Sequence, residues 1–334
     1  MPRSTGRLSL EQYVQGVLND DRTTLARAIT LVESDRHDDI ELSGRLLDAI
    51  LPRTGGSRRV GITGVPGAGK STFIDTLGMH LIHDRGEKVA VLSVDPASPV
   101  SGGSILGDKT RMERLCLEPR AFIRPSSSRG RLGGVAPRTR EAVMLCEAAG
   151  FENVLVETVG VGQSETAVRS MSDFFLLLMI PGAGDELQGV KRGIIEMIDA
   201  IAINKADGDN HARAERARVE YSSALHLFRA PASGWSPRVV TCSALTGDGI
   251  QPIWEMVLEH RRHFESTGRL AQLRSHQALE WLRELISQGI EREFRSHRAV
   301  ARRLPELEHA VREGKITPSA ASRELSSLFH CKED

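Results

Sequence analysis

The spacing of apolar positions changes twice along the chain. Residues 1–56 repeat apolar side chains every three or four residues, as at Leu10 and Val14, which is typical of amphipathic helices. Between residues 57 and 265, short apolar runs rich in β-branched residues alternate with helical stretches. From 266 to 334 the helical spacing returns. We therefore expect an N-terminal helical extension, a central α/β domain and a C-terminal helical extension.

Six apolar runs in the central zone predict strands. They are residues 59–63, 89–94, 153–157, 174–180, 200–204 and 239–242. Strands that alternate with helices and are apolar throughout are typical of a parallel sheet covered on both faces. The expected fold class is therefore α/β, with a mostly parallel central sheet flanked by the two helical extensions.

A glycine-rich segment follows the first predicted strand and opens a predicted helix. It reads Gly64-Val65-Pro66-Gly67-Ala68-Gly69-Lys70-Ser71-Thr72 and fits the phosphate-binding pattern GxxxxGK[ST]. Glycines let backbone N–H groups surround phosphate oxygens without Cβ clashes, and the helix N-terminus adds positive potential. In such a loop, Lys70 would neutralise charge on the β- and γ-phosphates, and the Ser71 hydroxyl would ligate Mg²⁺.

A second motif indicates which base the nucleotide carries. Asn204-Lys205-Ala206-Asp207 comes at the end of a predicted strand and resembles the NKxD motif of GTPases. The Asp207 carboxylate would accept hydrogen bonds from N1–H and the 2-amino group of guanine, a donor pair that adenine lacks. Asn204 would join this loop to the phosphate loop. The predicted ligand is therefore GTP or GDP.

A third segment supports guanine over adenine. It follows the last predicted strand and reads Ser243-Ala244-Leu245. It resembles the short loop of GTPases in which a backbone N–H binds guanine O6. Because Ser-Ala is a common dipeptide, the segment gains weight only from its position behind the other two motifs.

Acidic residues near the ends of two predicted strands are candidates for the catalytic and metal-binding groups. Glu157 would hold Mg²⁺ through water, and the Gly160 N–H would sense the γ-phosphate. Asp95 could reach the Mg²⁺ hydration shell, and either Asp95 or Asp108, which lies in a glycine-rich stretch, could position the attacking water. No glutamine directly follows Gly160, as it does in small GTPases, so we expect slow intrinsic hydrolysis.

Five segments together point to one family. They are GVPGAGKST, SVDPASPVSGGSILGDKTRM, ETVGVGQSE, IPGAGDELQGVKRG and NKAD. On these segments the chain resembles the MeaB/ArgK family of methylmalonyl-CoA mutase-associated GTPases, which includes the mitochondrial methylmalonic aciduria type A protein. The resemblance covers nearly the whole chain, and residues 93–112 are its most specific part. Ala97 stands where family members often carry serine.

That resemblance implies a function as well as a fold. It implies a SIMIBI-class GTPase that forms homodimers and binds adenosylcobalamin-dependent methylmalonyl-CoA mutase. Such a protein protects the mutase and uses GTP to gate cofactor loading from an adenosyltransferase. The partners expected are therefore the mutase, a second copy of the chain and an adenosyltransferase.

Two surfaces are expected to contact other proteins. An apolar stripe in the C-terminal extension would be exposed if that zone stood alone, so we expect it at a two-fold dimer contact, the alternative being that it packs on the chain's own central domain. Its residues are Leu279, Leu282, Ile286 and Ile290. The glycine-rich segment 181–191, with polar side chains at Asp185 and Lys191, is expected either to sense the mutase or to be an ordinary loop.

Composition excludes several other functions. Lys plus Arg and Asp plus Glu number 44 each, so the chain has no general excess of positive charge for nucleic acid or an acidic membrane surface. Aromatic residues, at 4%, are too few for base-stacking platforms. The longest apolar run is too short to cross a bilayer. We therefore expect a cytoplasmic protein with reduced cysteines and with neither nucleic acid nor membrane as partner.

Three alternative functions remain at this point: a transport-system kinase, a metal-insertion GTPase and a binding module without turnover. The NKAD motif disfavours the kinase. The lack of a His-rich tail and of paired cysteines disfavours metal insertion. The pairs His80/His83 and His260/His263 have a metal-compatible spacing but no evident third ligand, so we interpret them as surface helix faces.

Overall fold

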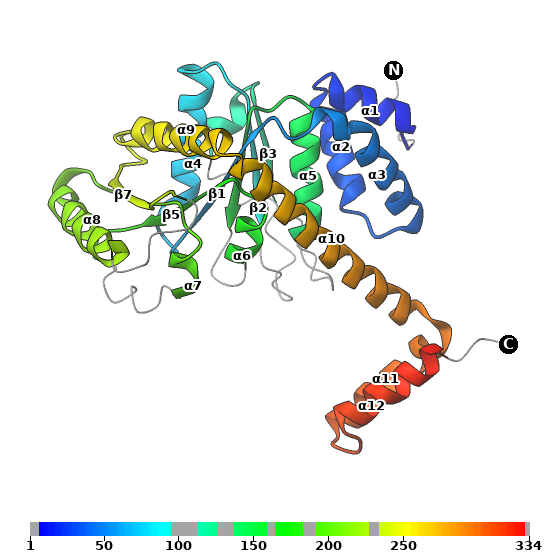
Figure 1. The fold of residues 1–334 in the computed structure, drawn as a ribbon. Coiled ribbons are helices and arrows are strands. Elements are labelled where there is room, and N and C mark those ends of the chain that lie inside the picture. Colours follow the sequence, from blue (N-terminus) through cyan, green and yellow to red (C-terminus); the bar gives the residue numbers. More distant parts are fainter. Residues whose placement is uncertain are drawn as a thin grey trace. The chain divides into compact units, whose positions relative to one another are not determined.

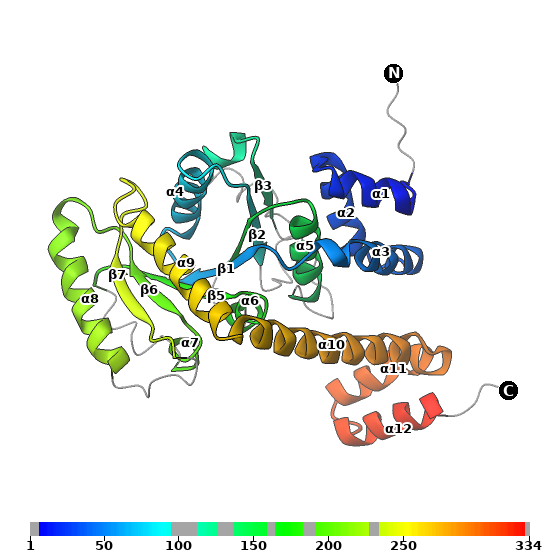
Figure 2. The same cartoon turned by 45° about the horizontal axis from the view of Figure 1, so that its top comes forward.

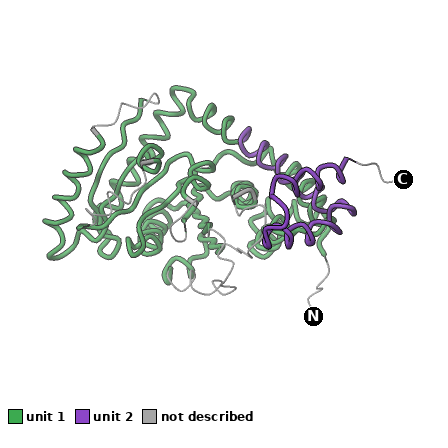
Figure 3. Tube along the Cα trace, turned by 90° about the horizontal axis from the view of Figure 1, so that it is seen from below, with its two compact units in different colours: residues 1–277 green, residues 278–334 purple. Residues whose placement is uncertain are grey.

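The computed structural model describes residues 7–94, 112–125, 136–158, 164–182, 192–226 and 234–330. The chain forms two compact units, residues 1–277 and 278–334 (Figure 3). The boundary between them falls inside the long helix α10 (Arg269–Ser296). The helices before residue 57 and the first turns of α10 therefore both belong to the larger unit, whereas the sequence pattern placed boundaries at 56 and 265.

Seven parallel strands form the centre of the larger unit (Figure 1). Their spatial order is β3-β2-β4-β1-β5-β6-β7. They are β1 (Arg58–Gly64), β2 (Val89–Val94), β3 (Ala121–Arg124), β4 (Asn153–Thr158), β5 (Phe174–Met179), β6 (Ala200–Ile203) and β7 (Arg238–Thr241). The α/β fold class is confirmed, as are the six strands expected from apolar runs. The sequence pattern missed β3, a four-residue strand at the sheet edge.

Helices cover both faces of this sheet (Figures 1 and 2). Apolar side chains of α4 (Lys70–His83) and α9 (Ile250–Ser266) share one core. A second core includes α5 (Ala136–Ala148), α6 (Ser164–Arg169) and α8 (His211–His226), with the short helix α7 (Arg192–Ile195) packed against it. Alternate residues of β5 supply the two cores: Phe174 contributes to the first and Phe175 to the second. None of the helices in the described part of the chain has the length and apolarity needed to cross a membrane.

The N-terminal helices pack on the outside of α5 (Figure 2). They are α1 (Leu10–Leu18), α2 (Arg22–Val32) and α3 (His37–Ile50). Their apolar faces meet in the same core as α5, where Leu25 and Leu46 are fully buried. Arg22 donates to the carbonyl oxygen of Ala121 at 2.5 Å, next to the edge strand. Because three short helices bury too little apolar surface alone, they join the larger unit.

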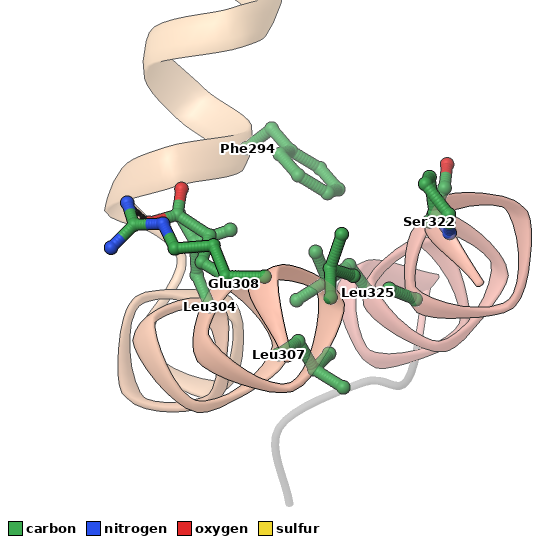
Figure 4. A pocket seen from close by; sticks show the side chains of 10 residues that line it. Phe294, Leu304, Leu307, Glu308, Ser322 and Leu325 are labelled. Atoms are coloured by element: carbon green, nitrogen blue, oxygen red, sulfur yellow. Dashed lines mark ion pairs between the residues drawn. The ribbon is translucent and has the colours of Figure 1, made fainter. Parts of the chain in front are cut away.

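The smaller unit consists of the rest of α10, α11 (Arg298–Arg312) and α12 (Pro318–His330). The start of α12 has the usual sequence features of a helix N-terminus: Pro318 is the first helical residue, and Thr317 accepts a hydrogen bond from the Ala320 N–H at 3.2 Å. Residues of α10, α11 and α12 line an open pocket (Figure 4). Its volume is about 460 Å³. Phe294, Leu304 and Leu325 line it, so its wall is mainly apolar.

The interpretation of His260 as a surface residue was wrong. Its side chain is 1% exposed and stacks on Phe264 with ring centroids 4.0 Å apart. Phe174 and Trp235 meet the same imidazole edge-on. An i,i+3 spacing does not show which face of α9 packs on the sheet, and the neighbouring aromatic residues decide it.

A buried ion pair fastens the start of α10 to the amino-terminal end of the sheet. Arg274 donates to both carboxylate oxygens of Asp173, at 2.9 and 2.7 Å, and also to the Ser57 carbonyl at 2.7 Å. Asp173 further accepts from the Arg59 N–H at 3.1 Å. Burial alone would raise the pKa of Asp173, but the hydrogen bonds and charge of Arg274, with help from Arg59, outweigh it and hold that pKa below its ordinary value of 3.8.

Arg274→Met should lower the free energy of unfolding by about 3–5 kcal/mol, because it leaves Asp173 buried without its charge partner. Asp173 has a lowered pKa in the folded state, so its contribution is complete above pH 4 and is lost as the pH falls through the folded pKa. The stability difference between wild type and Asp173→Asn should therefore shrink below about pH 4. Urea unfolding followed by circular dichroism at pH 7 and at lower pH measures both effects.

Arg218→Met is the matched control, because Arg218 pairs with Glu215 on the exposed face of α8. It should leave stability unchanged within error. An equal loss in both variants would show that the Asp173–Arg274 pair has no special role.

Candidate functional site

The residues singled out by the sequence come together at the carboxyl-terminal edge of the sheet. β1 lies between β4 and β5 at the centre, and the glycine-rich loop begins at its last residue, Gly64. Glu157 belongs to β4, and Asn204 directly follows β6. Ligand sites of open parallel sheets form at this edge, where the direction of strand order changes.

The glycine-rich loop is held in a shape that depends on glycine. Gly69 has φ +85°, and a Cβ there would lie 2.8 Å from Nδ2 of Asn204. A side chain would therefore combine backbone strain with a collision against a buried amide. Lys70 begins α4 directly afterwards, so the free N–H groups of the first helical turn face the loop. Pro66 and Thr72 are exposed, and Ala68 is buried.

Two polar side chains at the end of this loop, Lys70 and Ser71, have hydrogen-bond partners in the structure. Lys70 Nζ donates to the Gly64 carbonyl at 2.9 Å. Ser71 donates to Oε1 of Glu157 at 3.1 Å, and Glu157 is 4% exposed. A hydroxyl and a carboxylate oxygen at this separation are the hard oxygen donors that Mg²⁺ prefers, so the pair fits that cation. Among the residues that the structure describes, no group of three or more His, Cys, Asp or Glu could hold a metal.

Asn204 joins three segments through one fully buried side chain. Its Nδ2 donates to the Ala68 carbonyl at 2.7 Å, which is the link between base loop and phosphate loop that the motif led us to expect. Its Oδ1 accepts from the Ala244 N–H at 2.9 Å and from the Cys242 thiol at 3.7 Å. Burial raises the pKa of Cys242 to about 12, so the thiol stays protonated and can donate.

The base-reading motif is closed by a second contact. Ser243 donates to Oδ2 of Asp207 at 2.5 Å, while the Asp207 side chain remains only partly buried. Lys205 adopts φ +61°, an uncommon conformation for a residue with a side chain, and is exposed. Leu245 is 79% exposed beside this loop. The two loops thus carry a partly exposed carboxylate, an exposed apolar side chain and an exposed lysine in an uncommon backbone conformation.

Some predicted site residues lie outside the described residues. They are Asp95, Asp108 and Gly160, together with Asp185 and Lys191 of the segment 181–191. Their assigned roles stay predictions.

Two contacts near the site were not anticipated. The hydroxyls of Thr63 and Thr158 lie 3.0 Å apart in the buried interior between β1 and β4. Thr76 of α4 donates to the Ala244 carbonyl at 2.7 Å. The sequence holds no local signal for either contact, because their partners are about a hundred residues or more away.

The phosphate loop lies at the end of the central strand, and a buried asparagine ties it to a loop that bears an aspartate. This arrangement defines a P-loop nucleotide-binding protein of the α/β class. Residues 25–299 match the family described as "Methylmalonyl Co-A mutase-associated GTPase MeaB". The chain belongs to this family and is a GTPase.

Individual relatives agree with this assignment. A Caulobacter vibrioides protein named as a GTPase is 51% identical over 322 residues, which is 96% of this chain and 98% of that protein. The mouse protein named methylmalonic aciduria type A homolog, mitochondrial, is 43% identical over 96% of this chain and 79% of its own length. A crystal structure named as a LAO/AO transport system kinase superposes with a TM-score of 0.73 at 40% identity, covering 99% of both chains.

Proposed function

We propose that this GTPase acts as a chaperone of adenosylcobalamin-dependent methylmalonyl-CoA mutase, protecting the mutase and gating the transfer of cofactor from an adenosyltransferase. The observation that carries the proposal is the match of residues 25–299 to a family named for its association with that mutase. The name of the mouse relative, which refers to methylmalonic aciduria, supports the same partner.

The phosphate end of the site is assigned to three side chains. Backbone N–H groups of the loop surround the phosphates, and Lys70 exchanges its bond to the Gly64 carbonyl for phosphate oxygens. Ser71 would hold Mg²⁺ directly and Glu157 through water, which fits their 3.1 Å separation. Bound there, Mg²⁺ would neutralise charge that develops on the phosphate oxygens.

The remaining catalytic roles are assigned from position in the sequence. Asp95 completes the metal's water shell, Asp95 or Asp108 positions the attacking water, and the Gly160 N–H senses the γ-phosphate. The base is held by Asp207 on its N1–H and 2-amino edge and by a backbone N–H of the segment 243–245 at O6. Lys205 and Leu245 lie beside these groups and would cover the ring faces.

Asp207→Asn should weaken GDP binding and improve binding of xanthosine diphosphate. The substitution removes charged hydrogen bonds worth on the order of 1.5–3 kcal/mol each, and the introduced amide can donate to the 2-oxo group of xanthine. Isothermal titration with GDP, ADP and xanthosine diphosphate measures the change. Asp209→Asn, in the exposed turn that follows, is the control and should bind GDP as the wild type does. Equal wild-type affinity for GDP and ADP would contradict the guanine assignment.

Hydrolysis by the isolated protein should be slow and should rise when the mutase is added. The sequence has no glutamine directly after Gly160 to orient the attacking water, so the isolated protein should hydrolyse GTP slowly. We expect the mutase to act by ordering a loop, which should raise the rate by less than the roughly 10³–10⁵-fold that a supplied arginine gives. Phosphate release is measured with and without mutase, using an equal mass of an unrelated protein as control. Fast hydrolysis that the mutase does not change would contradict the proposal, and transfer of labelled γ-phosphate to protein would favour the transport-system kinase.

A homodimer through α10 is part of the same proposal. Leu279, Leu282, Ile286 and Ile290 recur at helical spacing on α10 and are 51–58% exposed. Apolar residues on one stripe of a helix are typical of a surface that another chain covers. A two-fold contact would place the stripes of two copies against each other.

Replacing Leu282 and Ile286 together by Glu should convert a dimer into a monomer, because four like charges would face one another across the two-fold contact. Light scattering measures the mass, and GDP affinity should stay unchanged. Arg292→Glu alters net charge by the same amount on the far side of the helix, at 100° per residue, and should leave the dimer intact. A double variant that remains dimeric would place the contact elsewhere.

A further inference from the structure

Thr76 lies outside the motifs that bind nucleotide, yet it holds one of them. It belongs to the second turn of α4, the helix that begins at Lys70. Its hydroxyl donates to the Ala244 carbonyl at 2.7 Å. The N–H of Ala244 is held from the other side by Asn204 at 2.9 Å. Ala244, in the middle of the segment 243–245 expected to bind guanine O6, is therefore fixed at both its polar backbone groups.

Arg114 decides the direction of the Thr76 hydroxyl. Its guanidinium donates to Thr76 Oγ1 at 2.8 Å and to Oδ2 of Asp75 at 2.7 Å. A guanidinium has donors only, so the Thr76 oxygen must accept from it. The hydroxyl proton is then free to point only at another acceptor, and the Ala244 carbonyl is the one within reach.

Arg114 is itself held in place by buried groups. Asp75 is 6% exposed and also accepts from the Leu115 N–H at 2.8 Å. Leu115 is fully buried over Gly78, where an added Cβ would lie 2.6 Å from its methyl carbon. Residues 114 and 115 are thus bound to α4 by charge, by hydrogen bonding and by packing. This rigidity lets Arg114 orient a hydroxyl.

We propose that Thr76 and Arg114 are positioning residues for guanine recognition: Arg114, anchored on Asp75, orients the Thr76 hydroxyl, which fixes the carbonyl of Ala244. These hydrogen bonds connect α4 to the segment 243–245 and involve no backbone group of the phosphate loop. It should therefore set the affinity for the base and leave the affinity for phosphate alone. The inference rests on the proposed assignment of residues 243–245 to guanine.

Thr76→Val keeps the shape of the side chain and removes the hydroxyl. The loss of one neutral hydrogen bond to the loop should weaken GDP binding by about fivefold to tenfold and lower the GDP-to-ADP ratio by a similar factor. Pyrophosphate affinity should change by less than about twofold, because its contacts are at the other end of the site. Thr76→Ser keeps the hydroxyl and should behave as the wild type.

Arg114→Lys is the second variant, chosen because the Arg114 side chain is 54% exposed and a lysine can still pair with Asp75. A single ammonium cannot reach Asp75 and Thr76 in the guanidinium's two-armed geometry, so base selectivity should fall in the same direction. Isothermal titration with GDP, ADP and pyrophosphate is run on every variant, with the melting temperature recorded.

Unchanged GDP-to-ADP selectivity in Thr76→Val and Arg114→Lys would overturn the inference while leaving the guanine site intact. Equal losses of GDP and pyrophosphate affinity would also overturn it, because Thr76 would then only support the fold. If the wild type does not prefer GDP to ADP, the base assignment under the proposed function fails, and the inference fails with it.

Discussion

The buried amide of Asn204 is the contact on which the whole site depends. It spans the carbonyl of Ala68 in the phosphate loop and the N–H of Ala244 in the base-reading loop. Both are backbone groups, so the side chain fixes two loops without depending on other side chains. A buried amide that lost either partner would cost about 1–3 kcal/mol, so the three segments hold one another in register. The same amide leaves no room for a side chain at Gly69.

The parallel sheet makes that contact possible. All the strands run in the same direction. The carboxyl ends of β1, β4, β6 and β7 therefore lie on the same edge of the sheet. Four residues that are far apart in the chain therefore lie at or near this edge: Gly64, Glu157, Asn204 and Ser243. At the opposite edge, the Asp173–Arg274 pair fixes the first turns of α10 to the amino ends of β1 and β5. One sheet therefore carries the candidate site at one end and holds the first turns of α10 at the other.

Thr76 adds a second connection between α4 and the segment 243–245, which we propose to bind the base. Asn204 joins them through the phosphate loop, and Thr76 joins them through the helix that follows it. Arg114 joins the same set of hydrogen bonds, because it donates to both Asp75 and Thr76.

Local features of the sequence determined the strands, the loop motifs and the start of α12. Each depends on neighbours in the chain: continuous apolar runs for β4 and β5, the glycines before Lys70, and proline after Thr317. The structure alone decided β3, whose four residues lie at an edge, and the burial of His260, which depends on Phe174 of β5 and Trp235 before β7 as well as on Phe264 of its own helix. It alone also decided the contacts of Thr76 and Arg114, since a hydroxyl on one helix and a guanidinium 38 residues later carry no shared pattern. Periodicity and turn chemistry act over a few residues, whereas these contacts form only when the packed sheet has brought distant segments together.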